Sequence, residues 1–175
     1  MMKKIYLAML LLVSVYGYSQ EVKFGVRGGY NISNLDFDTP ITVENIHRNG
    51  IFIGFLAEIG LSKGIAFMPE IQLSAEGAKD EDLQLDYLQM PLYFKFRLSE
   101  KFHVGLGPQV GLKSHKFEDG LRDWAYSGVG GLEFKLSHTL FLDARYTYGV
   151  VNIFDKDLGD EAINTNIQLG IGYKF

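Results

Sequence analysis

The sequence has no cysteine, and only four of its 175 residues are proline. Without cysteine the protein has no disulfide, no thiol nucleophile and no cysteine-ligated zinc site. It also has no cluster of lysine and arginine, and its formal net charge is −4. A nucleic-acid surface needs a concentrated basic stripe that neutralises phosphates, so no nucleic-acid partner is expected.

Long hydrophobic runs are missing too, apart from one near the start. The run from Ile5 to Val13 follows Lys3 and Lys4 and precedes Gly17-Tyr18-Ser19, in which Gly17 and Ser19 are small residues at the spacing that a signal peptidase needs. It is shorter than the roughly 20 residues that a membrane-spanning helix needs. A basic flank, an apolar run and a small-residue site predict a secretory signal peptide at residues 1–19. Residues 20–175 contain no linker-like stretch, so one domain is expected there.

What the sequence does have is glycine, aromatic residues and alternation. It contains 20 glycines, 13 phenylalanines and 10 tyrosines. Apolar and polar residues alternate with period two, as in β-strands. The alternating segments lie at about 22–32, 51–61, 65–77, 88–98, 102–112, 124–136, 140–150 and 163–175. In the third, Ile71 and Leu73 alternate with Glu70, Gln72 and Ser74. Such clean separation indicates that the two faces meet different environments.

The connections between these segments alternate between short and long. Residues 62–64, 99–101 and 137–139 form tight turns, whereas the other connections, at about 33–50, 77–82, 113–123 and 152–162, are longer and more polar. Short periplasmic turns, long extracellular loops and an even strand number are typical of outer-membrane barrels. The pattern therefore predicts an all-β fold, a closed eight-stranded antiparallel up-and-down transmembrane β-barrel in the cell outer membrane, with both termini periplasmic and the long loops extracellular.

A soluble eight-stranded barrel of the lipocalin type is the alternative, because alternation alone does not say which face points inward. Three features favour the membrane. Bulky residues are concentrated on the apolar face, glycine and charged residues share the other face, and aromatic residues recur near strand ends, where a membrane interface favours them.

Several stretches resemble a known family. They are FGVRGGYNISNL (24–35), YLQMPLYFKFRL (87–98), FHVGLGPQVGLK (102–113), LDARYTYGVVNI (142–153) and NIQLGIGYKF (166–175). Together they are similar to the small porin-like or PorT-like outer-membrane β-barrel domains of Gram-negative bacteria. The resemblance implies an eight-stranded barrel in the outer membrane and little chemistry. It also implies that Phe175, the last residue of the sequence, is an assembly signal read by the barrel assembly machinery.

Charged residues on the polar face would lie inside the barrel. An isolated charge there is costly, so opposite charges should pair. We expect a lumenal ion-pair network of Arg27, Glu70 and Arg145 near one depth and Glu58, Lys95, Glu133 and Asp143 near another. A structural plug is favoured over a proton relay or a ligand site.

Nothing in the sequence indicates an enzyme, a cofactor or a metal. Of the histidines, only His103 lies on the polar face of a predicted strand, and no second base or nucleophile accompanies it. The acidic stretch at 155–162 fails as a calcium loop, because Gly159 stands where an oxygen ligand belongs and Asp160 where the turn glycine belongs.

The sequence therefore predicts a structural or surface-interaction protein whose lumen is plugged by side chains. The expected partners are outer-membrane lipid and lipopolysaccharide, and no obligate protein partner is identifiable. A binding or transport barrel for a small apolar ligand and a lipid-modifying enzyme remain alternatives. Four aromatics near the loops could either line a ligand entrance or act as interface anchors, which is favoured: Phe37, Phe117, Trp124 and Phe154.

Overall fold

The computed structural model describes residues 21–37, 46–79, 84–114, 121–154 and 162–175. The strands are β1 (Val22–Phe37), β2 (Arg48–Gly60), β3 (Ile65–Gly77), β4 (Gln84–Arg97), β5 (Phe102–Lys113), β6 (Trp124–Lys135), β7 (Leu140–Gly149) and β8 (Ala162–Lys174). Within these ranges there is no helix long and apolar enough to cross a membrane. The predicted signal peptide at 1–19 lies outside the described residues.

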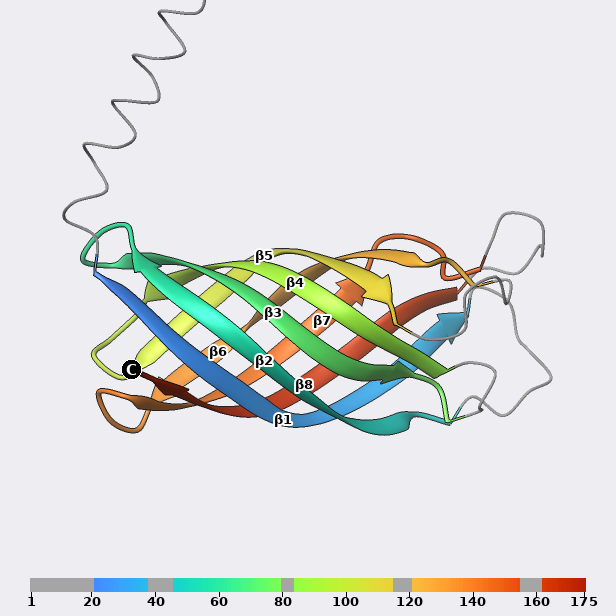
Figure 1. Cartoon of the computed structure of the whole chain (residues 1–175), viewed down its shortest axis with the longest axis horizontal. Coiled ribbons are helices and arrows are strands. Elements are labelled where there is room, and N and C mark those ends of the chain that lie inside the picture. The colour runs from blue at the N-terminus through green and yellow to red at the C-terminus, as the bar shows by residue number, and fades with distance from the viewer. Residues whose placement is uncertain (1–20, 38–45, 80–83, 115–120, 155–161) are drawn as a thin grey trace, which may run out of the picture.

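The strands form one closed antiparallel barrel in which each strand pairs with its neighbours in the chain. Figure 1 shows them tilted around a common axis, with β1 and β8 side by side. These two close the barrel through a continuous register from Gly25–Lys174 to Phe37–Ala162. Closure removes the edge strands and their unpaired backbone groups, which could not be satisfied in lipid. The predicted fold class is confirmed.

The three predicted tight turns are also confirmed, and they are built alike. Each begins with a serine, Ser62, Ser99 or Ser137, whose hydroxyl oxygen accepts hydrogen bonds from backbone N–H groups two and three residues later. Such turns satisfy donors that strand pairing does not reach. We call this end of the barrel, where the C-terminal end of β8 also lies (Figure 1), the turn end, and the opposite end the loop end.

Along most of the wall, apolar side chains point outward and polar ones inward. In β3, Ile71 and Leu73 are 56% and 55% exposed, whereas Glu70 and Gln72 are 2% and 1% exposed. A lipocalin-type barrel has the opposite arrangement, with an apolar interior and a charged surface. The burial pattern therefore excludes the soluble-barrel alternative.

At the loop end the arrangement reverses. Leu35 points inward and is fully buried, while its neighbours Asn34 and Asp36 are exposed. Leu35 belongs to a buried cluster, the apolar cap, made of Leu35, Ala78, Leu85, Tyr87, Leu121, Ile153 and Ala162. The 16 residues of β1 span about 40 Å at a tilt of about 40°, more than the roughly 25 Å apolar band of such barrels. The strands therefore continue into water, where an apolar interior is favourable.

This reversal corrects the predicted strand boundaries. The first segment was expected to end at Ile32 and to be followed by a loop at 33–50, but β1 continues to Phe37 and β2 begins at Arg48. The alternation of buried and exposed residues persists from Ser33 to Asp36, with Ser33 and Leu35 inside the barrel and Asn34 and Asp36 on the outer face. The prediction that a loop begins at residue 33 was therefore wrong.

The aromatic residues predicted near the loops fall into two groups, one inside the barrel and one on its outer face. Phe37 and Phe154 pack against the apolar cap with ring centroids 6.3 Å apart, so they extend the cap and are not interface anchors. Trp124 points outward and is 53% exposed, as an anchor would be. Phe117 lies outside the described residues.

Candidate functional site

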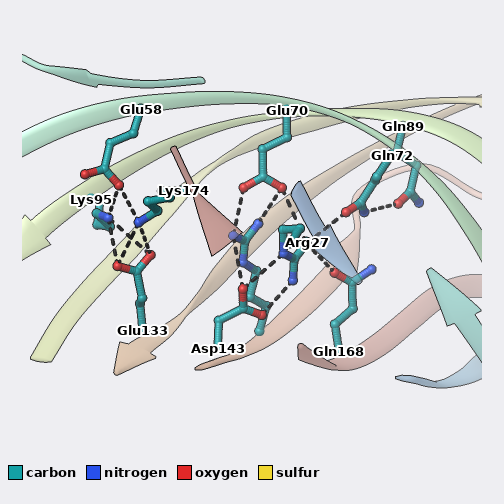
Figure 2. Close-up of polar contacts among 11 residues, drawn as sticks. Arg27, Glu58, Glu70, Gln72, Gln89, Lys95, Glu133, Asp143, Gln168 and Lys174 are labelled. Carbon is teal, nitrogen blue, oxygen red and sulfur yellow. Dashed lines mark hydrogen bonds and ion pairs between the residues drawn. The ribbon is translucent and has the colours of Figure 1, made fainter. Parts of the chain in front are cut away.

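The inward-facing side chains of the strands meet on the barrel axis and fill the lumen. Figure 2 shows two groups of charged residues, followed toward the loop end by glutamines. The structure brings the residues predicted for the lumenal network into these two groups: Arg27, Glu58, Glu70, Lys95, Glu133, Asp143 and Arg145. The charged groups are therefore the candidate functional site.

The group at mid-height, the arginine cluster, joins two arginines to two carboxylates. Arg27 donates from Nε and Nη2 to the two oxygens of Asp143, at 3.0 and 2.6 Å. Arg145 donates from Nη1 and Nη2 to the two oxygens of Glu70, at 2.9 and 2.8 Å. Arg27 Nη1 also lies 3.4 Å from Glu70 Oε2, which links the two pairs. All four side chains are 0–1% exposed, and the formal charges cancel.

The group nearer the turn end, the lysine cluster, has the same balance of charge. Lys95 donates to Glu58 and, at 2.9 and 3.1 Å, to the oxygens of Glu133. Lys174 donates to Glu58 at 2.6 Å and to Glu133 at 3.1 and 3.2 Å. Each lysine thus contacts both carboxylates, and no net charge is left in the cluster. Paired charges of this kind avoid the cost of an isolated charge in a low-dielectric interior.

Aromatic rings cover the cations and occupy the space left by glycines. The guanidinium of Arg145 lies 4.4 Å from the ring centre of Tyr93, and the ammonium of Lys174 lies 4.2 Å from that of Phe141. A Cβ atom on Gly105 would collide with the Tyr93 ring, and one on Gly172 with the Phe141 ring. Glycine at these two positions therefore leaves the space that the aromatic rings occupy.

Beyond the arginine cluster the lumen becomes a layer of amides and hydroxyls. Gln72 and Gln168 accept hydrogen bonds from Arg27 at 2.9 and 3.2 Å. Nearer the loop end, Glu76 accepts hydrogen bonds at 2.7 to 2.9 Å from the side chains of Ser74, Gln89, Asn164 and Asn166. The apolar cap follows at the loop end. Polar side chains thus fill the lumen, and an apolar cluster lies above them.

Two features of the predicted network need correction. Asp143 was expected at the depth of Lys95 and Glu133, but it contacts Arg27 in the other cluster. Asp143 is the strand-pairing partner of Glu133, yet in a tilted barrel the pairing direction is inclined to the axis, so partners differ in height. Lys174 was missed, although alternation in the last strand places it on the same face as Gln168.

The arrangement supports packing more readily than acid-base chemistry, since the carboxylates of both clusters are held by cations. The described residues contain no group of three or more His, Asp or Glu side chains that could hold a metal ion. Sequence reasoning also did not identify the inward-facing rings of Phe52 and Phe141, which stack on Arg27 and Lys174. Their signal was present, because each occupies an inward position of its strand.

Phe175 lies at the turn end beside β1. Its backbone N–H donates to the carbonyl oxygen of Phe24 at 2.8 Å. Its ring lies near Tyr173, with centroids 6.5 Å apart, and is 69% exposed. Because these contacts are few, removing Phe175 should cost the folded barrel little stability. An effect of its removal on assembly can therefore be measured separately.

Deletion of Phe175 is predicted to lower the level of folded protein in the outer membrane several-fold while leaving the folded barrel nearly as stable. The lost backbone hydrogen bond contributes only about 1 kcal/mol. Membrane fractionation and the heat-modifiable gel shift measure the first effect, and refolding of purified protein into lipid vesicles measures the second. Phe102→Ala, which removes another exposed ring at the turn end, is the control. Normal membrane levels after deletion would contradict the prediction.

A closed eight-stranded barrel with an apolar outer wall and a polar interior is an outer-membrane β-barrel. Residues 5–175 match the family described as outer membrane protein beta-barrel domain, and the chain belongs to that family. It is a small outer-membrane barrel protein with a lumen filled by its own polar side chains. A search of curated proteins found no match.

Solved structures share this fold at low sequence identity. The attachment invasion locus protein Ail of Yersinia pestis is 18% identical, with 89% of this chain and 99% of that chain covered and a TM-score of 0.57. Neisserial surface protein A is 13% identical, with 89% and 99% covered and a TM-score of 0.57. A de novo designed transmembrane β-barrel is 10% identical, with 87% and 95% covered and a TM-score of 0.52.

Proposed function

We propose that the protein acts through its loop end, as a structural or surface-interaction protein at the cell exterior, and that the barrel is a plugged, non-enzymatic anchor. The apolar cap carries this proposal. It lies between the polar lumen and the loop end, and Leu35 and Leu85 within it are fully buried. A solute that entered from the loop end would have to cross this cluster and then break the two charge clusters beneath it. Interactions at the loop end therefore need no passage through the barrel.

The proposed orientation places the turn end, with both termini, in the periplasm and the loop end outside. Short periplasmic turns and longer extracellular loops are the usual arrangement in this class. Outer-membrane lipid would contact the apolar wall, lipopolysaccharide the outer part of the barrel, and the assembly machinery the last strand. The names of two structural neighbours, an attachment protein and a surface protein, agree with a surface role, although those proteins share only the fold with this chain.

A lipid-modifying enzyme is the less favoured alternative, because acyl-transfer chemistry needs a nucleophile beside a positioned base. Among the described histidines, His103 is buried in the lumen, whereas His47 lies at the loop end and His138 in a tight turn. No hydrogen bond between any of these histidines and a serine or threonine hydroxyl is found among the described residues.

Cysteine labelling tests the orientation on which this function depends. Because the chain has no cysteine, single-cysteine variants can be labelled selectively. Lys79→Cys at the loop end and Lys63→Cys in a tight turn both replace exposed residues. In intact cells a membrane-impermeant maleimide should label Lys79→Cys and not Lys63→Cys, and it should label both once the outer membrane is permeabilised. The reverse pattern in intact cells would refute the proposal.

A further inference from the structure

The turn end of the lumen opens into two hollows that share Lys23, Arg97 and Lys135 in their walls. The larger has a volume of about 510 Å³ and the smaller about 170 Å³. Their combined lining holds three glutamates and six cations: Lys23, Lys63, Lys95, Arg97, Lys101 and Lys135. This local excess of positive charge contrasts with the formal net charge of −4 for the whole chain.

No ion pair is found among the described residues for four of these six cations: Lys63, Arg97, Lys101 and Lys135. Lys95 is paired within the lysine cluster, and Lys23 lies 3.1 Å from Glu21. Arg97 donates from Nε only to the backbone carbonyl of Ser99, at 3.3 Å. Lys101 and Lys135 make no ion pair with any acidic group in the described part of the chain. Arg97, Lys101 and Lys135 line the larger hollow together.

A buried imidazole provides a second, independent observation. His103 lines the smaller hollow with Arg97 and Lys135 and is 4% exposed. Its Nδ1 atom is buried and has no hydrogen-bond partner among the described residues. A buried nitrogen without a partner carries an energetic cost that an oxygen-rich ligand in the hollow would remove.

We propose that the turn-end mouth of the barrel is a binding site for a phosphate-bearing anion, held by Arg97, Lys101 and Lys135 with His103 at its floor. A phosphate group carries up to two charges and several acceptor oxygens, which matches several converging cations better than a single carboxylate does. The guanidinium of Arg97 has the planar fork that binds phosphate oxygens in pairs. The volume fits a phosphate, a pyrophosphate or a lipid headgroup.

The position of the site allows two sources for this ligand. The rings of Phe102 and Phe134 lie next to the mouth on the outer wall, with centroids 4.8 Å apart. Aromatic residues at such a rim mark the membrane interface, where lipid headgroups lie. The ligand is therefore either the phosphate of an anionic phospholipid or a soluble phosphorylated compound on the same side of the membrane. The site does not depend on which side that is.

Isothermal titration with inorganic pyrophosphate tests the site in folded full-length protein purified in dodecyl maltoside, a detergent without phosphate. Saturable binding with one site per barrel is expected, and it should weaken as salt is raised. The double variant Arg97→Gln/Lys135→Gln should bind at least 10-fold more weakly. Lys79→Gln, which removes one positive charge from an exposed position at the loop end, should bind like the unmodified protein. Each variant is first checked for the heat-modifiable gel shift.

Nanodiscs then distinguish the two sources. If phosphatidylglycerol nanodiscs abolish pyrophosphate binding and phosphatidylcholine nanodiscs retain it, the anionic lipid headgroup occupies the site. If both retain it, the ligand is a soluble phosphate compound, and the site proposal stands in either case. Absence of saturable binding in detergent, or equal weakening in Lys79→Gln and the double variant, would overturn it.

Discussion

Replacement of Glu70 by alanine is expected to destabilise the folded barrel by about 3–5 kcal/mol, the usual cost of removing one partner from a buried ion pair. Glu70 accepts both hydrogen bonds that Arg145 donates with its terminal nitrogens, at 2.8 and 2.9 Å. Without it, two buried arginines share the single carboxylate of Asp143, and the cluster gains a net positive charge. Equilibrium unfolding by guanidinium chloride in lipid vesicles measures the change, with the single tryptophan, Trp124, on the outer wall as the fluorescent probe.

A charge-balanced double variant separates the effect of losing charge balance from the effect of losing packing. The variant Glu70→Ala/Arg145→Met keeps the bidentate pair of Arg27 and Asp143, so it restores neutrality. It should be more stable than Glu70→Ala alone. Asp86→Ala is the surface control, because its ion pair with Arg48 is partly exposed and contributes about 1 kcal/mol or less. A Glu70→Ala variant no less stable than Asp86→Ala would show that the cluster does not hold the barrel together.

Replacement of Gly29 by alanine is expected to prevent or severely weaken closure of the barrel. Gly29 lies on β1 opposite Gly170 of β8. A Cβ atom at Gly29 would lie 2.8 Å from the Cα of Gly170 and 2.9 Å from the carbonyl carbon of Leu169. These are backbone atoms, so relief requires the two strands to separate at the seam. We expect a loss of at least about 3 kcal/mol, the upper end of ordinary overpacking costs.

Gly128→Ala is the matched control, because a Cβ atom there meets nothing within 4 Å. It should fold normally and remain within about 1 kcal/mol of the unmodified protein. Unheated gel samples report whether each variant reaches the compact folded form, and the unfolding assay gives the free energies. If Gly29→Ala folds as well as Gly128→Ala, the close approach of β1 and β8 does not limit closure.

The strand pattern was readable from the sequence because the two faces of the wall meet different environments. Ile71 and Glu70 belong to opposite faces by a simple period of two, and no knowledge of the partner strand is needed. The tight turns were readable for a similar reason, since Ser62 and its counterparts satisfy the backbone within three residues. The loop end was less predictable. There the apolar Leu35 points inward. Whether an inward residue is polar or apolar depends on its position along the barrel axis, which the period of two does not give.

The candidate site was predictable in composition but not in its pairing. Charges on a lumenal face must find partners, and this argument identified Arg27, Glu70 and Arg145 from the sequence alone. Which carboxylate meets which cation depends on strand tilt and on side-chain reach across the lumen. Asp143 was therefore placed with the wrong neighbours. Phe141 was missed because its position in the alternation indicates the inner face of the strand, whereas its apolar side chain is of the kind expected on the outer face.

The apolar cap bears on which parts of the sequence can vary in evolution. Because Leu35 and its neighbours form a buried apolar core at the loop end, the strand ends there are held together by packing that is separate from the ion pairs of the lumen. Loop sequences can therefore diverge, or be exchanged for foreign peptides, without a matching change in the membrane part. The barrel is therefore suited to serve as a display scaffold, in which foreign peptides replace connections at the loop end and the transmembrane wall keeps its sequence.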